Sequence, residues 1–378
     1  MNALPATLPG PDYHDPAVYS LDREAIFFRS WICVGRTEDV RDAGQWITAD
    51  VAGESILVTR NQENSLRAFY NVCRHRGSRL CDEDSGQVKS AFRCPYHAWT
   101  YTLDGTLRGT PHVGREEVSR EAHGLWTVAV DEWQGFVFVN LQRDDPPALR
   151  DALADSEGVL DLERFDLSGL RRGFRSVHEV QANWKIIVAN YNECLHCPTV
   201  HPELVDIVPA FRSGVVFEDG RSDGGVSLAE GRMSVADDRE SRHLLIPGMA
   251  GEEASSYFGS LLFPAMFLDI SGCEAIATLV QPTGPTSCRL VTDYLFHPDS
   301  VSRADFDPSA VVEFNERVAE QDNAVCERAQ KGVMSRAFTH GVYPEKDAEV
   351  YKFDLHYKRL RDDFQARAQE ADAARRNG

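Results

Sequence analysis

Apolar side chains near the start of the chain follow the spacing of an α-helix. Between about residues 16 and 33 they recur every three or four residues, so they would share one face of a helix. They are Leu21, Ala25, Phe28 and Ile32. The spacing predicts a helical arm over residues 1–34, ahead of the first domain.

After this arm the apolar pattern becomes that of β-strands. Short runs rich in β-branched and aromatic residues are separated by polar segments, and Asp104-Gly105 is a typical hairpin turn. The expected strands are residues 55–59, 66–72 and 135–141. We therefore predict a small antiparallel β domain over residues 35–145.

The stretch from 142 to 172 is rich in Asp, Arg and Pro, and it marks the expected domain boundary. Beyond it a helix is predicted from Asn183. Pro198 is expected to end this helix, because proline lacks an amide hydrogen and clashes with the preceding turn. The apolar face of this helix comprises Trp184, Ile187, Val188, Tyr191 and Leu195.

The remaining pattern alternates between sheet and helix. Strands are expected at residues 261–270, 275–280 and 290–296, and helices at residues 308–332 and 347–372. The second domain, residues 173–378, is therefore predicted to be an antiparallel sheet flanked by helices. The expected fold class of the whole chain is α+β.

Length and composition allow two domains, each with its own core. The chain has 378 residues, 42% of them hydrophobic, and its formal net charge of −19 opposes binding to nucleic acid or an anionic membrane. No basic and then apolar segment opens the chain and no long apolar run occurs, so we expect a cytoplasmic protein without a membrane span. The nine cysteines fit reduced thiols better than a disulfide framework.

Two short segments each offer one thiolate and one imidazole. Cys73 and His75 are followed, after eighteen residues, by Cys94 and His97. A common zinc finger takes two Cys from one loop and two His from the other, whereas a Rieske [2Fe-2S] cluster needs a Cys pair on one iron and a His pair on the second. One Cys and one His in each segment predict a Rieske cluster, with a structural zinc ion as the alternative.

A second constellation lies beyond the expected boundary. His196 and His201 are five positions apart, with Pro198 between them. On an unbroken helix such a pair would point about 140° apart, but a break at the proline would let both reach one metal. Two imidazoles and one carboxylate with open positions are the ligands of mononuclear non-haem Fe(II) sites.

The first of these segments closely resembles the Rieske domain of ring-hydroxylating non-haem iron oxygenases. Residues 73–77 and 94–101 are similar to the family motif, except that Ala98 stands where a Gly is usual. Ser78 and Tyr96 occupy places where high-potential Rieske proteins carry extra cysteines, which implies a low-potential cluster. By this resemblance the cluster ligands are Cys73, His75, Cys94 and His97.

The second segment, from Asn183 to Leu204, resembles the iron-binding segment of the same family. The resemblance implies that His196 and His201 bind the iron together with an Asp far downstream in a helix. Asp322 matches that place, and Glu327 is its competitor.

The family resemblance implies that Glu193 lies between two metal centres. In the family a carboxylate at this position links an iron histidine to a cluster histidine of the adjacent subunit, here His97. Most ring hydroxylases have Asp there. Glu is similar to the branch that acts on quaternary ammonium compounds such as glycine betaine, stachydrine and carnitine.

The resemblance implies the oxygenase component of a multicomponent monooxygenase. No Gly-x-Gly-x-x-Gly turn follows a strand, so electrons from NAD(P)H would come through a separate reductase that carries flavin and a ferredoxin-type cluster. With O2 and a small quaternary ammonium substrate, the expected reaction is hydroxylation of an N-methyl group and loss of formaldehyde. Hydroxylation of an aromatic acid is the alternative.

A pure electron carrier is a further alternative, but it would leave the His196 segment unexplained. In the family the iron needs the cluster of a neighbouring subunit, which implies a ring of subunits, expected to be a homotrimer.

Two further groups of residues are interpreted in this light. Cys194 and Cys197, late in the predicted helix, are expected to be buried unreactive thiols, and His178 and the other remaining histidines have no comparable setting. A permanent cation is held by aromatic faces at about 0.5–2 kcal/mol per contact. One or two pocket residues are expected among Phe211, Phe217, Tyr257, Phe258, Phe263 and Phe267.

Overall fold

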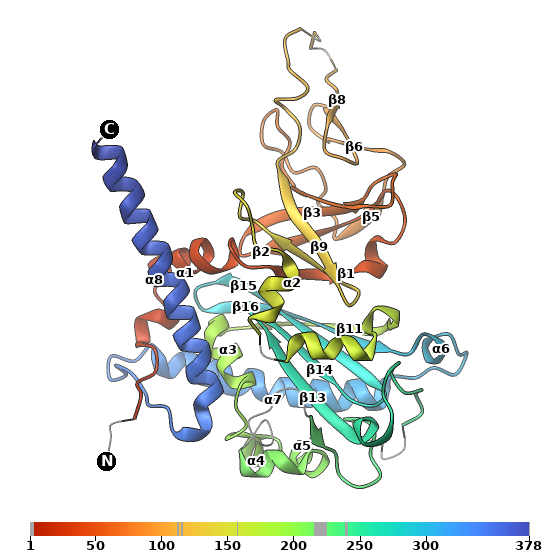
Figure 1. Cartoon of the computed structure of the whole chain (residues 1–378), viewed down its shortest axis with the longest axis vertical. Coiled ribbons are helices and arrows are strands. Elements are labelled where there is room, and N and C mark those ends of the chain that lie inside the picture. The colour runs from red at the N-terminus through yellow and green to blue at the C-terminus, as the bar shows by residue number, and fades with distance from the viewer. Residues whose placement is uncertain are drawn as a thin grey trace. The chain divides into compact units, whose positions relative to one another are not determined.

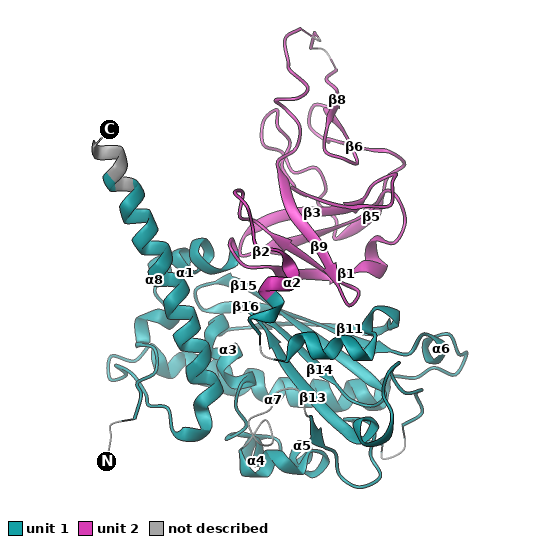
Figure 2. Cartoon of the chain, in the orientation of Figure 1, with its two compact units in different colours: residues 1–27, 153–378 teal, residues 28–152 magenta. Residues whose placement is uncertain are grey.

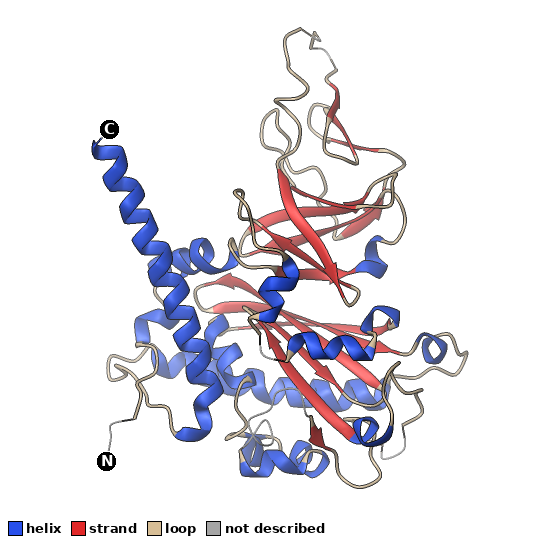
Figure 3. Ribbon diagram, in the orientation of Figure 1, coloured by secondary structure: helices blue, strands red, loops and turns tan. Residues whose placement is uncertain are grey.

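Antiparallel sheets form the centre of both units into which the chain divides (Figures 1 and 2). The computed structural model describes residues 4–111, 113–114, 116–156, 158–214, 225–238 and 241–377. Unit 2 comprises residues 28–152, and unit 1 comprises residues 1–27 and 153–378. Figure 3 distinguishes the strands of each unit from the helices, and the α+β class is confirmed.

Unit 2 is built from a seven-stranded and a three-stranded sheet. The strands of the larger sheet are β1 (Ile32–Arg36), β2 (Gln45–Val51), β3 (Glu54–Arg60), β4 (Leu66–Tyr70), β5 (Ser85–Gln87), β9 (Thr127–Trp133) and β10 (Phe136–Asn140). Their order is β1-β10-β9-β4-β3-β2-β5. The smaller sheet contains β6 (Ala91–Arg93), β7 (Thr100–Thr102) and β8 (Leu107–Gly109). The strands predicted at 55–59, 66–72 and 135–141 are confirmed as β3, β4 and β10.

The hairpin turn predicted at Asp104-Gly105 joins β7 and β8. Gly105 has a φ of +79°, and a Cβ atom there would lie 2.4 Å from the ring of Phe69. A glycine is needed at this turn for both reasons. The close approach packs the small sheet onto a buried cluster that also contains Cys73 and Cys94.

The helical arm is shorter than predicted. It consists of α1 (Pro16–Asp22), whose first turn is capped by the side chain of Asp15, and a π-helical turn over Arg23–Phe27. Ile32, which was expected on the helix, begins β1 and pairs with Val139. The helical spacing continues past Phe27 by coincidence, because pairing with β10 determines the conformation of that segment.

Unit 1 contains a six-stranded antiparallel sheet of order β11-β16-β15-β14-β13-β12. Its strands are β11 (Arg171–Val180), β12 (Val226–Ser227), β13 (Ser256–Leu262), β14 (Met266–Ile270), β15 (Glu274–Gly284) and β16 (Ser287–Phe296). The single strand predicted at 261–270 is wrong, because the chain reverses between Leu262 and Met266, which pair with each other. Pro264 lies in this reversal, where its missing N–H is not needed by a strand ladder.

The helices of unit 1 include the two long ones predicted from periodicity. The described α-helices of unit 1 besides α1 are α3 (Trp184–Tyr191), α4 (Cys197–Val200), α5 (Pro202–Ile207), α6 (Pro298–Val301), α7 (Ser309–Val333) and α8 (Ala348–Asn377), and α2 (Leu149–Ala154) begins in unit 2. Helices α3 and α7 contact each other and lie against the sheet (Figure 1). Glu316 of α7 accepts hydrogen bonds from Ser176 of β11 and Tyr294 of β16. None of the described helices is long and apolar enough to cross a membrane.

The start of α3 is anchored by a buried charge pair. Asp22 accepts hydrogen bonds from the Trp184 indole at 3.0 Å, from the Tyr357 hydroxyl at 2.6 Å and from the ammonium group of Lys185. Lys185 and Asp22 are both almost fully buried, so each charge depends on the other for its partner. This network ties α1, α3 and α8 together and fixes the helix that leads into the second predicted metal site.

Candidate functional site

Helix α3 ends at Tyr191, which is earlier than predicted. The backbone N–H of Asn192 still donates to Val188, after which the chain turns and α4 begins with Pro198 in its first turn. Pro198 therefore starts a helix, where its missing N–H has no partner to lose, and does not end α3. His196 is the N-cap residue of α4, and His201 lies between α4 and α5. The break before His196 is what lets both imidazoles face the same point.

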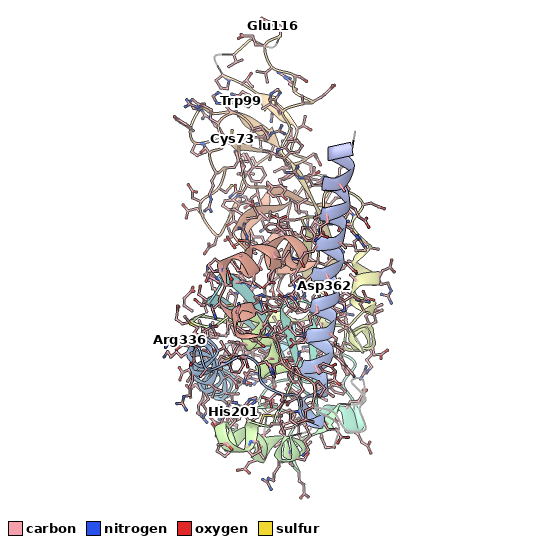
Figure 4. The ribbon with its side chains drawn as sticks, turned by 90° about the vertical axis from the view of Figure 1, so that its left-hand side faces the viewer. Cys73, Trp99, Glu116, His201, Arg336 and Asp362 are labelled. Atoms are coloured by element: carbon pink, nitrogen blue, oxygen red, sulfur yellow. A yellow bond between two sulfur atoms is a disulfide. The ribbon has the colours of Figure 1, made fainter. Side chains whose placement is uncertain are left out.

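His196, His201 and Asp322 form a compact group of ligand atoms. The Nε2 atoms of His201 and His196 lie 2.8 Å and 3.2 Å from the same Asp322 oxygen, Oδ1. One potential ligand atom from each residue lies within 4.8 Å of the other two. Asp322 comes from the middle of α7, more than a hundred residues further along the chain, and His201, labelled in Figure 4, is almost fully buried. Glu327, the competing carboxylate, instead accepts a hydrogen bond from the backbone of Gln181.

The outer nitrogen of each imidazole has its own partner. His196 Nδ1 lies 2.7 Å from Glu193 Oε1, and His201 Nδ1 lies 2.6 Å from Gln321 Oε1. Both partners are acceptors, so each Nδ1 carries a hydrogen, and each Nε2 would offer its lone pair to a metal bound beside Asp322. Gln321 is oriented in turn because its amide nitrogen donates to Glu203 at 2.8 Å. Two neutral imidazoles and a carboxylate held in this way fit a divalent iron.

The charges around this group favour a bound cation. Burial alone would lower the pKa of His196, but hydrogen bonds to Asp322 and Glu193 outweigh it and raise the pKa to about 9. Burial also acts to raise the pKa of Asp322, yet the two histidines hold it below its ordinary value. Positive charge is therefore stabilised at the point where the three side chains meet.

A cavity of about 210 Å³ adjoins the three side chains. Phe211, Tyr257 and Phe267 line it, whereas Phe258 and Phe263 do not, and Phe217 lies outside the described residues. Three of the candidate aromatic residues therefore reach the cavity, where one or two were expected.

The lining also includes residues to which the sequence assigned no role. They are His178, Asn190, Tyr191, Asp269 and Tyr294. Asn190 and Tyr191 stand within the segment that resembles the family, which is a usable signal, but nothing local marks the others. His178, Asp269 and Tyr294 come from β11, β14 and β16, and they reach one cavity only because these strands belong to the same sheet.

Cys194 and Cys197 form a disulfide, with their Cα atoms 5.0 Å apart. The expectation of two unreactive thiols late in a helix is wrong. Because α3 ends at Tyr191, both cysteines lie at the turn that leads into α4, and this turn brings the sulfur atoms together. The seven other cysteines form no disulfide, as expected.

The four residues of the first motif are also brought together, in unit 2. Cys73 and Cys94 are buried, whereas His75 is exposed and His97 half-buried, with ring centres 4.5 Å apart. Burial, together with the neighbouring Cys94 sulfur, raises the pKa of Cys73. Two sulfurs inside and two imidazoles outside match a cluster with a Cys pair on one iron and a His pair on the other.

The surroundings of this motif hold its side chains in place. The Tyr101 hydroxyl lies 3.3 Å from Cys73 Sγ and accepts a hydrogen bond from the Arg74 amide at 3.0 Å. The ring of His75 stacks on Trp99 with centres 4.8 Å apart. Figure 4 labels Cys73 and Trp99, both in unit 2.

The two ligand loops share one backbone turn, which explains the usual glycine of the family. Gly77 and Ala98 each lie four residues after a cysteine and donate a backbone hydrogen bond to its carbonyl, at 3.0 Å in both loops. Their φ angles are +74° and +58°. Glycine adopts this left-handed conformation freely, whereas alanine adopts it with strain.

Two protein families match the chain. The ring hydroxylating alpha subunit (catalytic domain) matches residues 167–362, and the Rieske [2Fe-2S] domain matches residues 30–130. The chain therefore belongs to the alpha subunits of Rieske ring-hydroxylating oxygenases. It carries a Rieske [2Fe-2S] domain and a catalytic domain for a mononuclear iron.

Several of the similar proteins are monooxygenases. The chain is 31% identical over 378 residues to the glycine betaine monooxygenase oxygenase subunit of Chromohalobacter salexigens, covering 92% of this chain and 83% of that protein. It is 40% identical over 205 residues to the carnitine monooxygenase oxygenase subunit of Acinetobacter pittii, covering 53% and 54%. A quaternary ammonium Rieske monooxygenase solved with L-carnitine aligns with a TM-score of 0.73 and 25% identity, over 94% of this chain and 96% of that one. The chain is thus the oxygenase subunit of a Rieske non-haem iron monooxygenase, which needs a reductase partner.

Proposed function

We propose that this oxygenase oxidatively removes an N-methyl group from a small quaternary ammonium compound. The observation that carries the proposal is the group of His196, His201 and Asp322 at a cavity lined by aromatic side chains. Aromatic faces attract a permanent cation. The relatives named for glycine betaine and carnitine support the same substrate class and oppose hydroxylation of an aromatic acid.

We assign the cofactors to the two regions predicted from the sequence. Residues 35–145 would hold the cluster, and residues 173–378 would hold the iron through His196, His201 and Asp322. The proposed cluster ligands are Cys73, His75, Cys94 and His97. When bound, the cluster supplies electrons and the Fe(II) activates dioxygen.

The chain's own residues supply orientation around the reacting carbon. Glu193 and Gln321 hold the imidazoles, and the apolar wall excludes water from the cavity. Hydroxylation of an N-methyl carbon gives a carbinolamine, which breaks its C–N bond, releases formaldehyde and leaves a tertiary amine.

The proposal includes partners beyond the single chain. The reductase would carry flavin and a ferredoxin-type cluster and would oxidise NAD(P)H. Glu193 would connect His196 to His97 of the adjacent subunit in a homotrimer, which gives the electron a short hydrogen-bonded path. The cytoplasmic location remains a prediction.

The test measures NADH oxidation and formaldehyde release together, with the purified oxygenase and a competent reductase. Trimethylammonium compounds are expected to give formaldehyde in proportion to the NADH consumed, and benzoate-like acids to give neither product nor coupled NADH oxidation. Hydroxylation of an aromatic acid without any formaldehyde from ammonium compounds would refute the proposal.

A further inference from the structure

The cavity beside the metal-binding group is lined by acidic but not by permanently basic side chains. None of its described lining residues is Lys or Arg, whereas four carry a carboxylate: Glu193, Asp269, Glu274 and Asp322. Together these four side chains could carry more negative charge than a divalent iron neutralises. Among the described lining residues there is therefore no permanent cation to balance an anionic substrate group.

Several hydrogen-bond donors of the lining are already directed at carboxylates. Ser271 donates to Glu274, and both His178 and Tyr294 lie at hydrogen-bond distance from Glu316, just behind the wall. A substrate carboxylate placed among these groups would lose its hydration and gain no charged partner. Burying an anion without a partner is strongly unfavourable.

Outside the iron-binding residues, Asp269 of β14 is the lining carboxylate with one oxygen that receives no hydrogen bond from the described residues. The hydroxyl of Tyr257 lies 2.5 Å and that of Tyr191 lies 2.8 Å from the same oxygen, Oδ1. No described residue donates a hydrogen bond to Oδ2, and Asp269 lines the cavity. This oxygen accepts a positive charge from the cavity side.

Aromatic faces surround this carboxylate. The rings of Tyr191 and Phe267 stack with centres 4.0 Å apart, and Phe211 meets Tyr257 edge to face at 5.5 Å. A carboxylate next to aromatic rings suits a methylated ammonium group, whose charge is spread over its methyl groups. An ordinary hydrogen-bonded ammonium would use the same carboxylate but would gain less from the rings.

The site also lies next to the metal-binding residues. Asn190, the neighbour of Tyr191, has its amide nitrogen 3.3 Å from His196 Nε2. Burial and the hydrogen-bonded Asp269 raise the pKa of Tyr257, which lines the same cavity as Asp322. Asp269 and the three residues that would bind the iron therefore line the same cavity.

On the basis of the proposed function, we propose that Asp269 holds the cationic nitrogen and that the cavity selects an ammonium compound without a carboxylate. Choline-like cations fit this description. Glycine betaine and carnitine, after which the relatives are named, each carry a carboxylate and would be disfavoured here.

Wild-type holoenzyme and isothermal titration calorimetry test the charge preference with three ligands of similar shape. Choline has a cationic head, glycine betaine adds a carboxylate, and 3,3-dimethyl-1-butanol replaces the charged nitrogen by carbon. Choline is expected to bind at least tenfold more tightly than either of the others. Binding of glycine betaine that equals or exceeds that of choline would overturn the proposal, and equal binding of the neutral alcohol would do the same.

Two variants locate the effect. Asp269→Asn keeps an oxygen that can accept from both tyrosines but removes the charge, so choline is expected to bind at least tenfold more weakly while the neutral alcohol is unaffected. Glu179→Gln removes a carboxylate from β11, an exposed position outside the cavity lining, and is expected to bind choline as the wild type does. An unchanged choline affinity in Asp269→Asn would refute the role of Asp269. Should that variant not fold, the wild-type comparison still decides the charge preference.

The same measurements separate this inference from the proposed function. If glycine betaine or carnitine binds, releases formaldehyde and outcompetes choline, the inference fails and the proposed function stands. If no ammonium compound binds and an aromatic acid is hydroxylated, both fail.

Discussion

Two hydrogen bonds determine which nitrogen each metal-facing histidine offers. Glu193 holds Nδ1 of His196, and Gln321 holds Nδ1 of His201, so both Nε2 atoms point at Asp322. Neither partner would touch the metal. Each acts by fixing the tautomer and the rotation of a ring, and such partners commonly change metal affinity or activity by about 10–100-fold.

Glu193→Gln tests whether the charge at this position matters beyond its hydrogen bond. The amide oxygen can still accept from His196, so we expect an intact cluster that is reduced at the normal rate, while product formation falls about 10–100-fold. Visible spectra follow the cluster and single-turnover product analysis follows the reaction. Glu193→Asp, which keeps the charge, should retain more activity. Unchanged turnover in Glu193→Gln would show that Glu193 is only a structural carboxylate.

The buried side chain of Asp269 is expected to lower the free energy of unfolding when it is ionised. Burial raises its pKa from 3.8 to about 6, against hydrogen bonds from Tyr257 and Tyr191 that lower it. The folded state therefore binds the proton more tightly than the unfolded state, and the free energy of unfolding falls as the pH rises between these two values. At neutral pH the loss is on the order of 3 kcal/mol.

The prediction is that Asp269→Asn, which never ionises, unfolds at a higher temperature than the wild type at pH 7.5, without ligand. The gain should shrink at pH 5 and disappear below about pH 3, because the wild-type carboxyl is then protonated in both states. Thermal unfolding across this pH range measures it, with Glu179→Gln as the control that shows no such trend. A gain independent of pH would contradict the raised pKa.

At the level of elements, the turn between α3 and α4 does most to assemble the iron site. It interrupts the helical spacing after Tyr191, turns Glu193 back onto His196, and contains the Cys194–Cys197 disulfide. Each of these contacts lies within six residues in sequence. The turn is therefore stabilised locally, and the long-range step is the approach of α7 with Asp322.

The disulfide can be detected by counting the cysteines that an alkylating reagent modifies. After denaturation and removal of iron, alkylation without a reductant should modify seven of the nine cysteines, and alkylation after reduction should modify all nine. Intact-mass spectrometry reads the number. The variant Cys194→Ala should show the same count with and without reduction. Nine modified cysteines without a reductant would mean that the pair is a dithiol in the isolated protein.

The whole molecule separates its two metal-binding groups into two units. The four residues of the Rieske motif lie in unit 2, and the His196 group lies in unit 1, each with its own sheet and its own buried cluster. Independent cores imply that one centre can be lost while the other persists.

His75→Ala and His97→Ala test this independence. Each should abolish the visible spectrum of the Rieske cluster, while the iron content falls from about three to about one per chain, because a [2Fe-2S] cluster holds two irons. Iron analysis and visible absorption measure both. A native spectrum in both variants would contradict the assignment of the cluster ligands, and complete loss of iron would contradict the independence of the two centres.

Local sequence patterns predicted the local features of this protein. The helical periodicity of α7 and α8, the apolar runs of β3, β4 and β10, and the Asp104-Gly105 turn each depend on neighbours in sequence and were confirmed. The family was confirmed for the same reason, since its motifs are short and continuous. The spacing of the Cys and His residues indicated two groups, and the structure brings both together.

Tertiary structure alone decided the features that join distant segments. Pairing with β10 takes Ile32 into a strand, Gln321 and Asp322 reach His201 across about one hundred and twenty residues, and Asp269 enters the cavity because β14 lies in the middle of a sheet. The periodicity of apolar residues cannot predict such contacts. It indicates which residues share one face of a helix or strand, but not which other segment packs against that face. The charge of the cavity, and with it the expected choice of substrate, depends entirely on these contacts between distant segments.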